Sequence, residues 1–262
     1  MKNHIFSPGK LLITSEYFVL DGALALAVPT RLGQDFYSEE EKDGASMVFW
    51  EALHENKPWL SIQIDYKNWE IVQTNLPESA AFILKVLQNV QKLSTEKFHS
   101  DSTYKITTNL QFPANYGLGS SSTLMNNLAE WSHIDAFLLN ELSLGGSGYD
   151  IACAQTNNPI LYWLENEKPN FEVVNFDPEF KDNIHFVYLN QKQSSKSAIS
   201  NYMNKQQSVY KIIPEINQIT KDVLLCKDGR SFALLMEKHQ AVMSNVLETL
   251  TVKEQLFSDF KG

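Results

Sequence analysis

The chain has 262 residues, of which 43% are hydrophobic and 20% are charged, and its formal net charge at pH 7 is -9. This size and composition allow a real hydrophobic core in one large domain or in two domains of ordinary size. The acidic balance, without a cluster of Lys and Arg, argues against nucleic acid as a partner.

The first third of the chain predicts mainly strands. The apolar run 17–20 is followed by Asp21-Gly22, a turn signal of hairpin type, and 23–28 has the apolar composition of a buried strand. Alternating apolar patches within 34–75 indicate antiparallel strands. The charge run 38–44 between them is expected to be a solvated turn and not a binding site.

The middle of the chain predicts a helix, a strand, a turn and a second helix. Apolar residues recur every three or four positions from Ser79 to Leu93, which indicates an amphipathic helix. Residues 105–112 are typical of a strand, and this strand leads into the glycine-containing segment 113–123. Helical spacing then continues as far as Trp131.

The rest of the chain predicts a mixture of strands and helices. We expect a helix near 136–142, strands at 159–164, 171–174 and 185–189, and amphipathic helices at 209–225 and 231–250. Because the two types do not alternate strictly, the α+β class is favoured over a doubly wound sheet. Asp177-Pro178-Glu179 marks the best domain boundary, so we expect a first domain at 1–180 and a second at 181–262.

Cysteines, histidines and the N-terminus carry weaker signals. The two cysteines lie far apart without a C-x-x-C pair, which is typical of buried thiols in a reducing compartment. The six histidines are scattered, so a zinc held by the protein is not expected. The first residues lack the apolar stretch of a signal peptide, and no run of 18 apolar residues occurs. We therefore expect a cytoplasmic protein that has no membrane segment.

Residues 113–123 read Pro-Ala-Asn-Tyr-Gly-Leu-Gly-Ser-Ser-Ser-Thr and are the most informative segment. Gly117 and Gly119 let the backbone bend where a Cβ would clash. A glycine turn that enters a helix leaves unpaired N–H groups at the positive end of the helix dipole, a geometry that binds phosphate. The serine hydroxyls can add oxygen ligands for Mg²⁺. The alternative is an ordinary Gly-Ser turn in which Ser120 only caps the helix.

Lys10 and Asp150 are two further candidates. Lys10 follows Ser7-Pro8-Gly9 at the entrance of an apolar strand, where it is either a surface lysine or a cation for a phosphate. Asp150 follows the glycine-rich turn 145–148 and is either a helix N-cap or a general base. Phosphoryl transfer to a hydroxyl needs a phosphate cradle, Mg²⁺, a cation and a carboxylate, and the chain offers one candidate for each.

These segments, in this order, resemble the GHMP kinases, a superfamily named after galactokinase, homoserine kinase, mevalonate kinase and phosphomevalonate kinase. The resemblance covers 7–13, 16–20, the loop 113–123 and 146–152, and Gly-Ser-Gly-Tyr-Asp-Ile-Ala is closest to the mevalonate and phosphomevalonate branch. It implies a two-domain α+β fold with mixed and antiparallel sheets and an active-site cleft between the domains.

The resemblance also implies roles for particular residues. Lys10 and Asp150 would be catalytic, with Asp150 as the base. The residues implied for the ATP phosphates are Pro113, Gly117, Leu118, Gly119, Ser120, Ser121 and Ser122, and those implied for the acceptor are Glu16, Tyr17, Ser147 and Gly148. The implied Mg²⁺ ligands are Ser121 and Glu141, although Glu141 also fits an exposed helix position. Ser194-Ser195-Lys196 is either a segment that reaches the substrate or a plain helix start.

Two features depart from the family pattern. A third glycine-rich loop near the C-terminus does not occur. Either the natural sequence and its second domain continue beyond Gly262, which we favour, or the active site lacks this loop. Ser15 stands where relatives often have glycine, which affects the geometry on the acceptor side.

The sequence therefore predicts an ATP- and Mg²⁺-dependent kinase that phosphorylates a hydroxyl or phosphate group of a small molecule, with mevalonate or phosphomevalonate as the first candidates. A homodimer is one assembly that we consider. The alternatives are a nucleotide-binding regulator without catalytic activity on the same fold, and an enzyme similar to mevalonate diphosphate decarboxylase.

Overall fold

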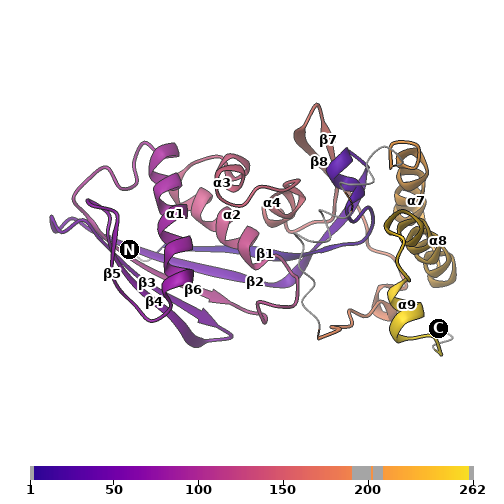
Figure 1. Ribbon diagram of the computed structural model, residues 1–262, viewed down its shortest axis with the longest axis horizontal. Coiled ribbons are helices and arrows are strands. Elements are labelled where there is room, and N and C mark those ends of the chain that lie inside the picture. The colour runs from indigo at the N-terminus through magenta and orange to yellow at the C-terminus, as the bar shows by residue number, and fades with distance from the viewer. Residues whose placement is uncertain (1–2, 191–201, 203–208, 260–262) are drawn as a thin grey trace. The chain divides into compact units, whose positions relative to one another are not determined.

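The computed structural model describes residues 3–190, 202 and 209–259 (Figure 1). The contacts between residues divide the chain into two compact units, one formed by 1–11 and 29–157 and the other by 12–28 and 158–262. The boundary expected after residue 180 falls inside the second unit, and the cleft expected between two domains stays a prediction. Among the described helices, none combines the length and the apolar character needed to cross a membrane.

The first unit is built on a mixed sheet. Its strand order is β5-β4-β3-β6-β2, with β1 paired to β2. The pair β3–β6 is parallel, whereas β2–β6, β3–β4 and β4–β5 are antiparallel. The strands are β1 (Asn3–Leu12), β2 (Ala25–Glu41), β3 (Met47–His54), β4 (Lys57–Asp65), β5 (Glu70–Thr74) and β6 (Thr103–Leu110).

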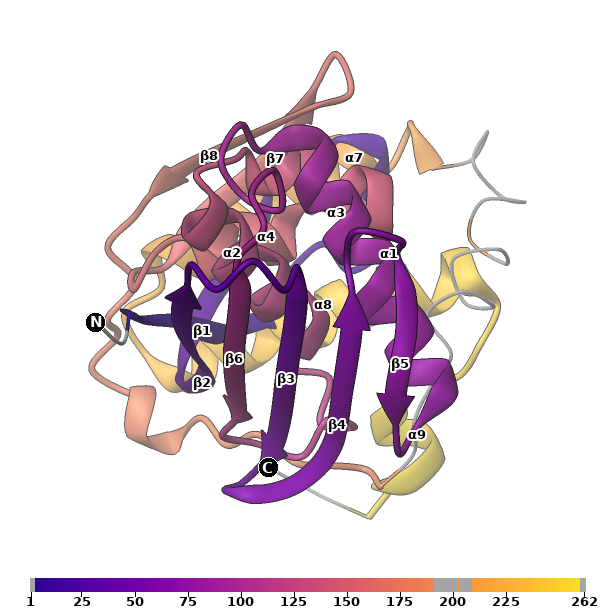
Figure 2. The same cartoon turned by 90° about the vertical axis from the view of Figure 1, so that its left-hand side faces the viewer.

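Four helices cover one face of this sheet (Figure 2). They are α1 (Pro77–Leu93), α2 (Ser120–Ser132), α3 (Ala136–Ser143) and α4 (Tyr149–Ala154). The apolar stripe of α1, with Ile83, Val86 and Val90, faces the core, as the three- and four-residue spacing predicts. Trp131 of α2 packs on Phe36 of β2 with 5.7 Å between ring centroids, which fixes α2 against the sheet.

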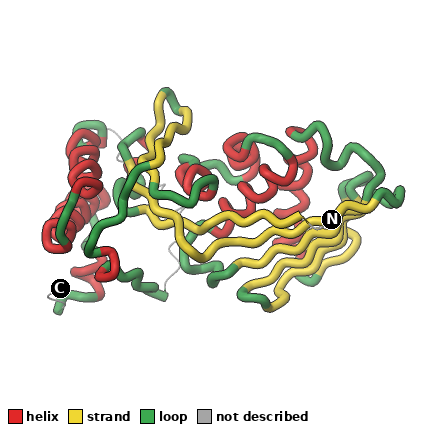
Figure 3. Tube along the Cα trace, turned by 180° about the vertical axis from the view of Figure 1, so that it is seen from behind, coloured by secondary structure: helices red, strands yellow, loops and turns green. Residues whose placement is uncertain are grey.

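The second unit consists of antiparallel strands and helices. Residues 25–27 of β2 pair with β7 (Ile160–Glu165), and β7 pairs with β8 (Lys168–Val173). The helices α7 (Ile213–Leu225) and α8 (Gly229–Leu247) lie side by side (Figure 3, red). The short elements are the 3₁₀ turns η1 (Phe18–Asp21) and η2 (Lys181–Asn183) and the helix α9 (Val252–Leu256).

Most predicted elements are confirmed, and three are corrected. The run 17–20 belongs to η1, which ends at Gly22 in the left-handed conformation and is not a hairpin turn. The charge run expected to be a turn at 38–44 continues β2 to Glu41, because these residues pair with β6 as far as Thr103. The segment 185–189 is irregular and not a strand. Its apolar composition alone therefore gave the wrong prediction. Residues 194–196 lie outside the described part of the chain.

Candidate functional site

The segment 113–123 forms the predicted passage from strand to turn to helix. Gly117 and Gly119 adopt φ values of 75° and 83°, a left-handed conformation that favours glycine. A Cβ on Gly119 would lie 2.9 Å from Ser122 Oγ and 3.1 Å from Lys10 Cγ, so this glycine permits a close approach. Helix α2 starts directly after it, at Ser120. The first N–H groups of α2 have no partner within the helix and remain available to an anion.

The serines after Gly119 differ in their surroundings. The N-cap of α2 is Gly119 and no side chain caps the helix, so the reading in which Ser120 is only a cap is wrong. Ser122 is buried and its hydroxyl donates to the carbonyl of Gly119 at 3.0 Å, which holds the turn together. Ser121 is exposed at the first turn, where a ligand can reach its hydroxyl.

Buried polar side chains anchor α2 to the sheet. Thr123 Oγ1 donates to Gln34 Oε1 at 3.0 Å, and Asn127 Nδ2 donates to the carbonyl of Gln34 at 3.0 Å. Ser7 of β1 donates to Asn127 Oδ1 at 2.7 Å. Because buried polar groups are costly without partners, these bonds fix the position of the helix and of the turn before it.

Strand β1 brings Lys10 to the same turn. The backbone N–H of Lys10 donates to the carbonyl of Leu118 at 3.0 Å. Gly9 makes this approach possible, because a Cβ there would lie 2.8 Å from that carbonyl oxygen and 2.6 Å from Thr30 Oγ1. The segment Pro8-Gly9-Lys10 therefore packs β1 against the glycine turn at 117–119.

The side chain of Lys10 meets Tyr149 and Asp150 at the start of α4. Lys10 Nζ lies 3.1 Å from Asp150 Oδ1 and donates to the hydroxyl of Tyr149 at 2.7 Å. The N-cap of α4 is Gly148, with φ 84°, so Asp150 lies inside the first turn and is not the cap. The Lys10 side chain is 15% exposed and the Asp150 side chain 39%, so a ligand can reach the carboxylate.

The electrostatics fix the protonation of two of these groups. Burial lowers the pKa of Lys10, but the nearby Asp150 and Tyr149 raise it by more, so its pKa lies above the ordinary value and the ammonium keeps its charge. Burial, followed by the charge of Asp150, raises the pKa of Tyr149. The phenol therefore stays protonated and acts as a hydrogen-bond donor and acceptor without a charge.

Tyr149 was not among the predicted site residues. Its position between Gly148 and Asp150 in the quoted motif was visible, but no local pattern indicated that its hydroxyl would meet a lysine 139 positions away.

A pocket of about 460 Å³ opens beside the first turn of α2. Ser120 and Ser121 lie on its wall together with apolar and aromatic side chains from β3, β4 and α1. His54 and Trp59 also line it, and their rings stack with 4.5 Å between centroids. No sequence pattern predicted this pocket, because its lining comes from several separate elements.

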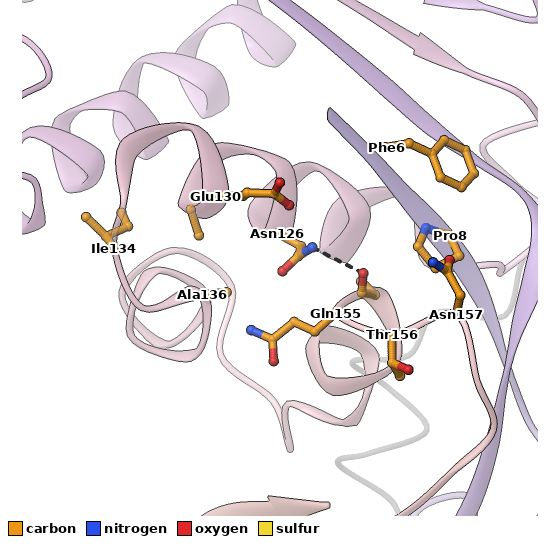
Figure 4. Close-up of a pocket in the computed structure, with 11 residues that line it drawn as sticks. Phe6, Pro8, Asn126, Glu130, Ile134, Ala136, Gln155, Thr156 and Asn157 are labelled. Atoms are coloured by element: carbon orange, nitrogen blue, oxygen red, sulfur yellow. Dashed lines mark hydrogen bonds between the residues drawn. The ribbon is translucent and has the colours of Figure 1, made fainter. Parts of the chain in front are cut away.

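A second pocket, of about 370 Å³, is lined mainly by polar groups (Figure 4). Asn126 of α2 lies in its wall and donates to the carbonyl of Ala154 at 3.1 Å, and Glu130, Gln155 and Asn157 are also part of the lining. None of the predicted site residues lines this pocket. The hypothesis of a phosphate site therefore concerns the first pocket and not this one.

The remaining predicted residues are more scattered. Glu141 is exposed on α3, and Ser147 lies in the turn before α4. Within the described residues no group of three His, Cys, Asp or Glu side chains could hold a metal. A Mg²⁺ ion would thus depend on phosphate oxygens for most of its ligands, with few from the protein, which is the usual arrangement for this ion. Glu16 and Tyr17 belong to the second unit, where Glu16 is exposed.

Comparison with known proteins gives a match in structure but none in sequence. No protein-family model and no curated protein sequence matches the chain. The mevalonate kinase of Methanococcus jannaschii is similar with a TM-score of 0.65 and 16% identity, over 94% of this chain and 80% of that one. The galactokinase of Lactococcus lactis, solved with galactose, has a TM-score of 0.67 and 12% identity, over 96% and 77%.

A third similar structure is a mevalonate diphosphate decarboxylase from Staphylococcus aureus, with a TM-score of 0.59 and 12% identity, over 94% of this chain and 73% of that one. At these identities the likeness establishes the fold, and both kinases named above are phosphotransferases. The chain therefore has the mixed α+β fold of the GHMP kinases.

Proposed function

We propose that this protein is an ATP- and Mg²⁺-dependent kinase that transfers the γ-phosphoryl group to a hydroxyl or phosphate of a small molecule, with mevalonate or phosphomevalonate as first candidates. The observation that carries the proposal is the pair of Lys10 and Asp150, whose charged groups lie 3.1 Å apart. Lys10 is on β1, whose backbone bonds to the turn before α2, and Asp150 is in the first turn of α4. A cation, a carboxylate and a helix N-terminus thus lie together, as phosphoryl transfer requires.

Each group has a chemical task in this proposal. The free N–H groups at the start of α2 bind phosphate oxygens, and the Lys10 ammonium stabilises the charge that develops on the transferred group. Asp150 orients the acceptor hydroxyl and takes its proton. Tyr149 accepts a hydrogen bond from Lys10 and limits the directions in which the ammonium can point.

The pocket beside α2 supports a nucleotide as the phosphoryl donor. Its wall combines the hydroxyls of Ser120 and Ser121 with the stacked rings of His54 and Trp59. An apolar, aromatic wall next to a phosphate-binding turn suits a flat base that is joined to phosphates. We therefore infer that the base of ATP occupies this pocket.

The described side chains could bind Mg²⁺ only together with the phosphates of the nucleotide, because they offer few ligands of their own. When bound, the ion neutralises phosphate oxygens. Ser121 is the protein ligand that the exposed first turn of α2 favours, and Glu141 stays a prediction. Cytoplasmic location and a homodimer also stay predictions.

Two alternatives share the same fold. A regulator that binds a nucleotide without turnover would not need the Lys10–Asp150 pair, so the retained pair favours an enzyme. A decarboxylase is suggested by the similar structure from Staphylococcus aureus. Release of CO₂ together with ADP would identify the decarboxylase, and binding of ATP without ADP formation would identify the regulator.

The test is ADP formation with mevalonate, 5-phosphomevalonate, mevalonate diphosphate and galactose, each with ATP and Mg²⁺. We expect Asp150→Asn to lower turnover by orders of magnitude while the affinity for ATP stays nearly unchanged. Glu70→Gln, at an exposed position of β5, is the control and should behave as the wild type. Full turnover in the Asp150→Asn protein would remove this carboxylate from the mechanism.

A further inference from the structure

The second pocket of the first unit, with a volume of about 370 Å³, has no role in the proposed phosphoryl transfer. Its volume is within the range of small-molecule sites and far exceeds the space that one water molecule fills. The residues that line it fall at 6–8, 126–136 and 154–157, and all of them belong to the first unit. One compact unit therefore forms this pocket, which we call the polar pocket.

Asn126 of α2 brings an unpaired oxygen to the polar pocket. The residue is only 6% exposed, and its amide nitrogen donates to Ser7 Oγ at 2.9 Å and to the carbonyl of Ala154 at 3.1 Å. Its side-chain oxygen accepts no hydrogen bond from any residue that the structure describes. Figure 4 shows this oxygen on the side of the pocket where Gln155 lies. A buried acceptor without a partner is costly, so this oxygen indicates a ligand that donates a hydrogen bond.

The two bonds of the amide nitrogen fix which atom of Asn126 faces the pocket. The carbonyl of Ala154 can only accept a hydrogen bond, and the hydroxyl of Ser7 already donates its hydrogen to Asn127 Oδ1 at 2.7 Å. Both partners of Asn126 therefore need the amide nitrogen, and the oxygen is left for the pocket. A ligand with an N–H or O–H group satisfies this oxygen, whereas a group that only accepts hydrogen bonds does not.

The charged group of the polar pocket is a carboxylate. Among the described residues that line the pocket, Glu130 is the one with a charged side chain, and no described lysine, arginine or histidine pairs with it. Glu130 follows Asn126 by four positions on α2, so both side chains lie on the same face of the helix (Figure 4). One ligand group can therefore contact the carboxylate and the Asn126 oxygen together.

Two helix ends add to the negative charge of the polar pocket. Glu130 belongs to the last turn of α2, which ends at Ser132, and Ala154 is the last residue of α4. The carboxyl end of a helix carries a partial negative charge and attracts cations. Among the described residues of the lining, no lysine or arginine balances these charges. The pocket therefore disfavours anions, which separates it from a site for a nucleotide or a phosphorylated substrate.

The rest of the lining limits the kind of cation. Most of it is apolar and consists of Phe6, Pro8, Ala129, Ile134 and Ala136. Within the described residues no group of three His, Cys, Asp or Glu side chains could hold a metal ion. A ligand that fits the pocket therefore combines a positively charged N–H donor with a short hydrocarbon part.

We propose that the polar pocket is a binding site for a small aliphatic amine, whose ammonium group donates to Asn126 Oδ1 and pairs with Glu130. The hydrocarbon part of the amine packs against the apolar side chains of the lining. This inference goes beyond the proposed function and does not depend on it, because it concerns other residues and a ligand of the opposite charge.

The experiment measures how three four-carbon probes bind to the full chain at pH 7 in a calorimetric titration. Butylamine is a cation, 1-butanol is neutral and butyrate is an anion. We expect saturable binding of butylamine, binding of 1-butanol that is weaker on the order of tenfold because a charged hydrogen bond is lost, and no binding of butyrate. Equal affinities for butylamine and 1-butanol, or no saturable binding of butylamine, would overturn the inference.

Two variants of Glu130 locate the binding site. Glu130→Gln removes the charge and keeps the shape, and we expect it to weaken butylamine binding on the order of tenfold. Glu130→Lys places an ammonium group beside Asn126 and should abolish butylamine binding. Both variants should fold, because Glu130 is exposed and the last turn of a helix favours a cation.

Glu70→Gln and Glu70→Lys, at an exposed position of β5, are the matched controls, since they change the net charge by the same amounts. We expect both to bind butylamine as the wild type does. Equal losses of affinity in the Glu70 and Glu130 variants would show that the amine binds only to the acidic surface, which contradicts the proposed site.

The two proposals fail independently, because the titration contains neither nucleotide nor acceptor. A protein that binds butylamine through Glu130 but forms no ADP with any acceptor of the panel would refute the proposed function and confirm the amine site. A protein that forms ADP but does not bind butylamine would give the opposite result.

Discussion

Replacing Tyr149 by Phe removes one hydroxyl from the centre of the candidate site. The ring remains, and Lys10 keeps its contact with Asp150 at 3.1 Å. The variant loses the hydrogen bond from the ammonium of Lys10 to the phenol at 2.7 Å and the hydrogen bond between the phenol and Asp150. Because the pKa of Lys10 is raised, the lysine stays charged in the variant, so the change tests orientation and not charge.

The expected size follows from the kind of bond. A hydrogen bond to a charged group contributes about 1.5–3 kcal/mol. If the hydrogen bond stabilises the transition state relative to the bound substrate, its loss lowers kcat roughly 10- to 150-fold. The conversion is that 1.4 kcal/mol corresponds to about a factor of ten. If the hydrogen bond only stabilises the folded state relative to the unfolded state, the free energy of unfolding falls by a similar amount and kcat changes little.

The assay therefore measures both quantities on the same protein. ADP formation at saturating ATP and acceptor gives kcat, and urea unfolding gives the free energy of unfolding. Tyr210→Phe, at a tyrosine that is 60% exposed, is the control for the loss of a phenol. A Tyr149→Phe protein with the kcat and the unfolding free energy of the wild type would refute our account of the Lys10–Tyr149 contact.

Three further predictions concern the loop, the metal and pH. Gly119→Ala should abolish most turnover and reduce the affinity for ATP. The reason is that Gly119 has φ 83° and that the new Cβ would press on Ser122 Oγ and Lys10 Cγ. An unchanged affinity for ATP in a titration would contradict this. Ser121→Ala should raise the Mg²⁺ concentration for half-maximal turnover, whereas an unchanged Mg²⁺ titration would exclude its hydroxyl as a ligand. The pKa of His239 falls from 6.5 to about 4 on folding, so the unfolded chain binds a proton that the folded site excludes. The free energy of unfolding should thus keep its full value above pH 6.5. It should decline by about 3 kcal/mol as the pH falls to about 4, because each pKa unit corresponds to about 1.36 kcal/mol. Urea unfolding at several pH values checks this, and His239→Gln should lack that part of the slope.

Local sequence patterns were sufficient for much of the first unit. The apolar spacing of 79–93 predicted a helix that the structure shows at Pro77–Leu93. The loop 113–123 was predicted as strand, turn and helix, because glycines and helical periodicity act over a few residues. The order of the motifs along the chain indicated the kinase fold that the structural comparisons then showed.

Local patterns gave the wrong prediction for two segments. The apolar segment 185–189 has the composition of a strand but is irregular. The charged segment 38–41 looks like a turn but pairs with β6, where Lys105 forms an ion pair with Glu41 at 2.6 Å. In both cases the local sequence leaves open whether a partner strand lies alongside.

The amino-acid sequence by itself determined the types of most helices and strands, the glycine turn and the candidate residues Lys10 and Asp150. Only the tertiary structure brought Tyr149 to Lys10, assembled the pocket beside α2 and joined His239 to Ser15 across 224 positions. The physical reason is that helix periodicity and turn geometry are short-range properties. Hydrogen bonds and pockets formed by distant segments depend on how the whole unit packs.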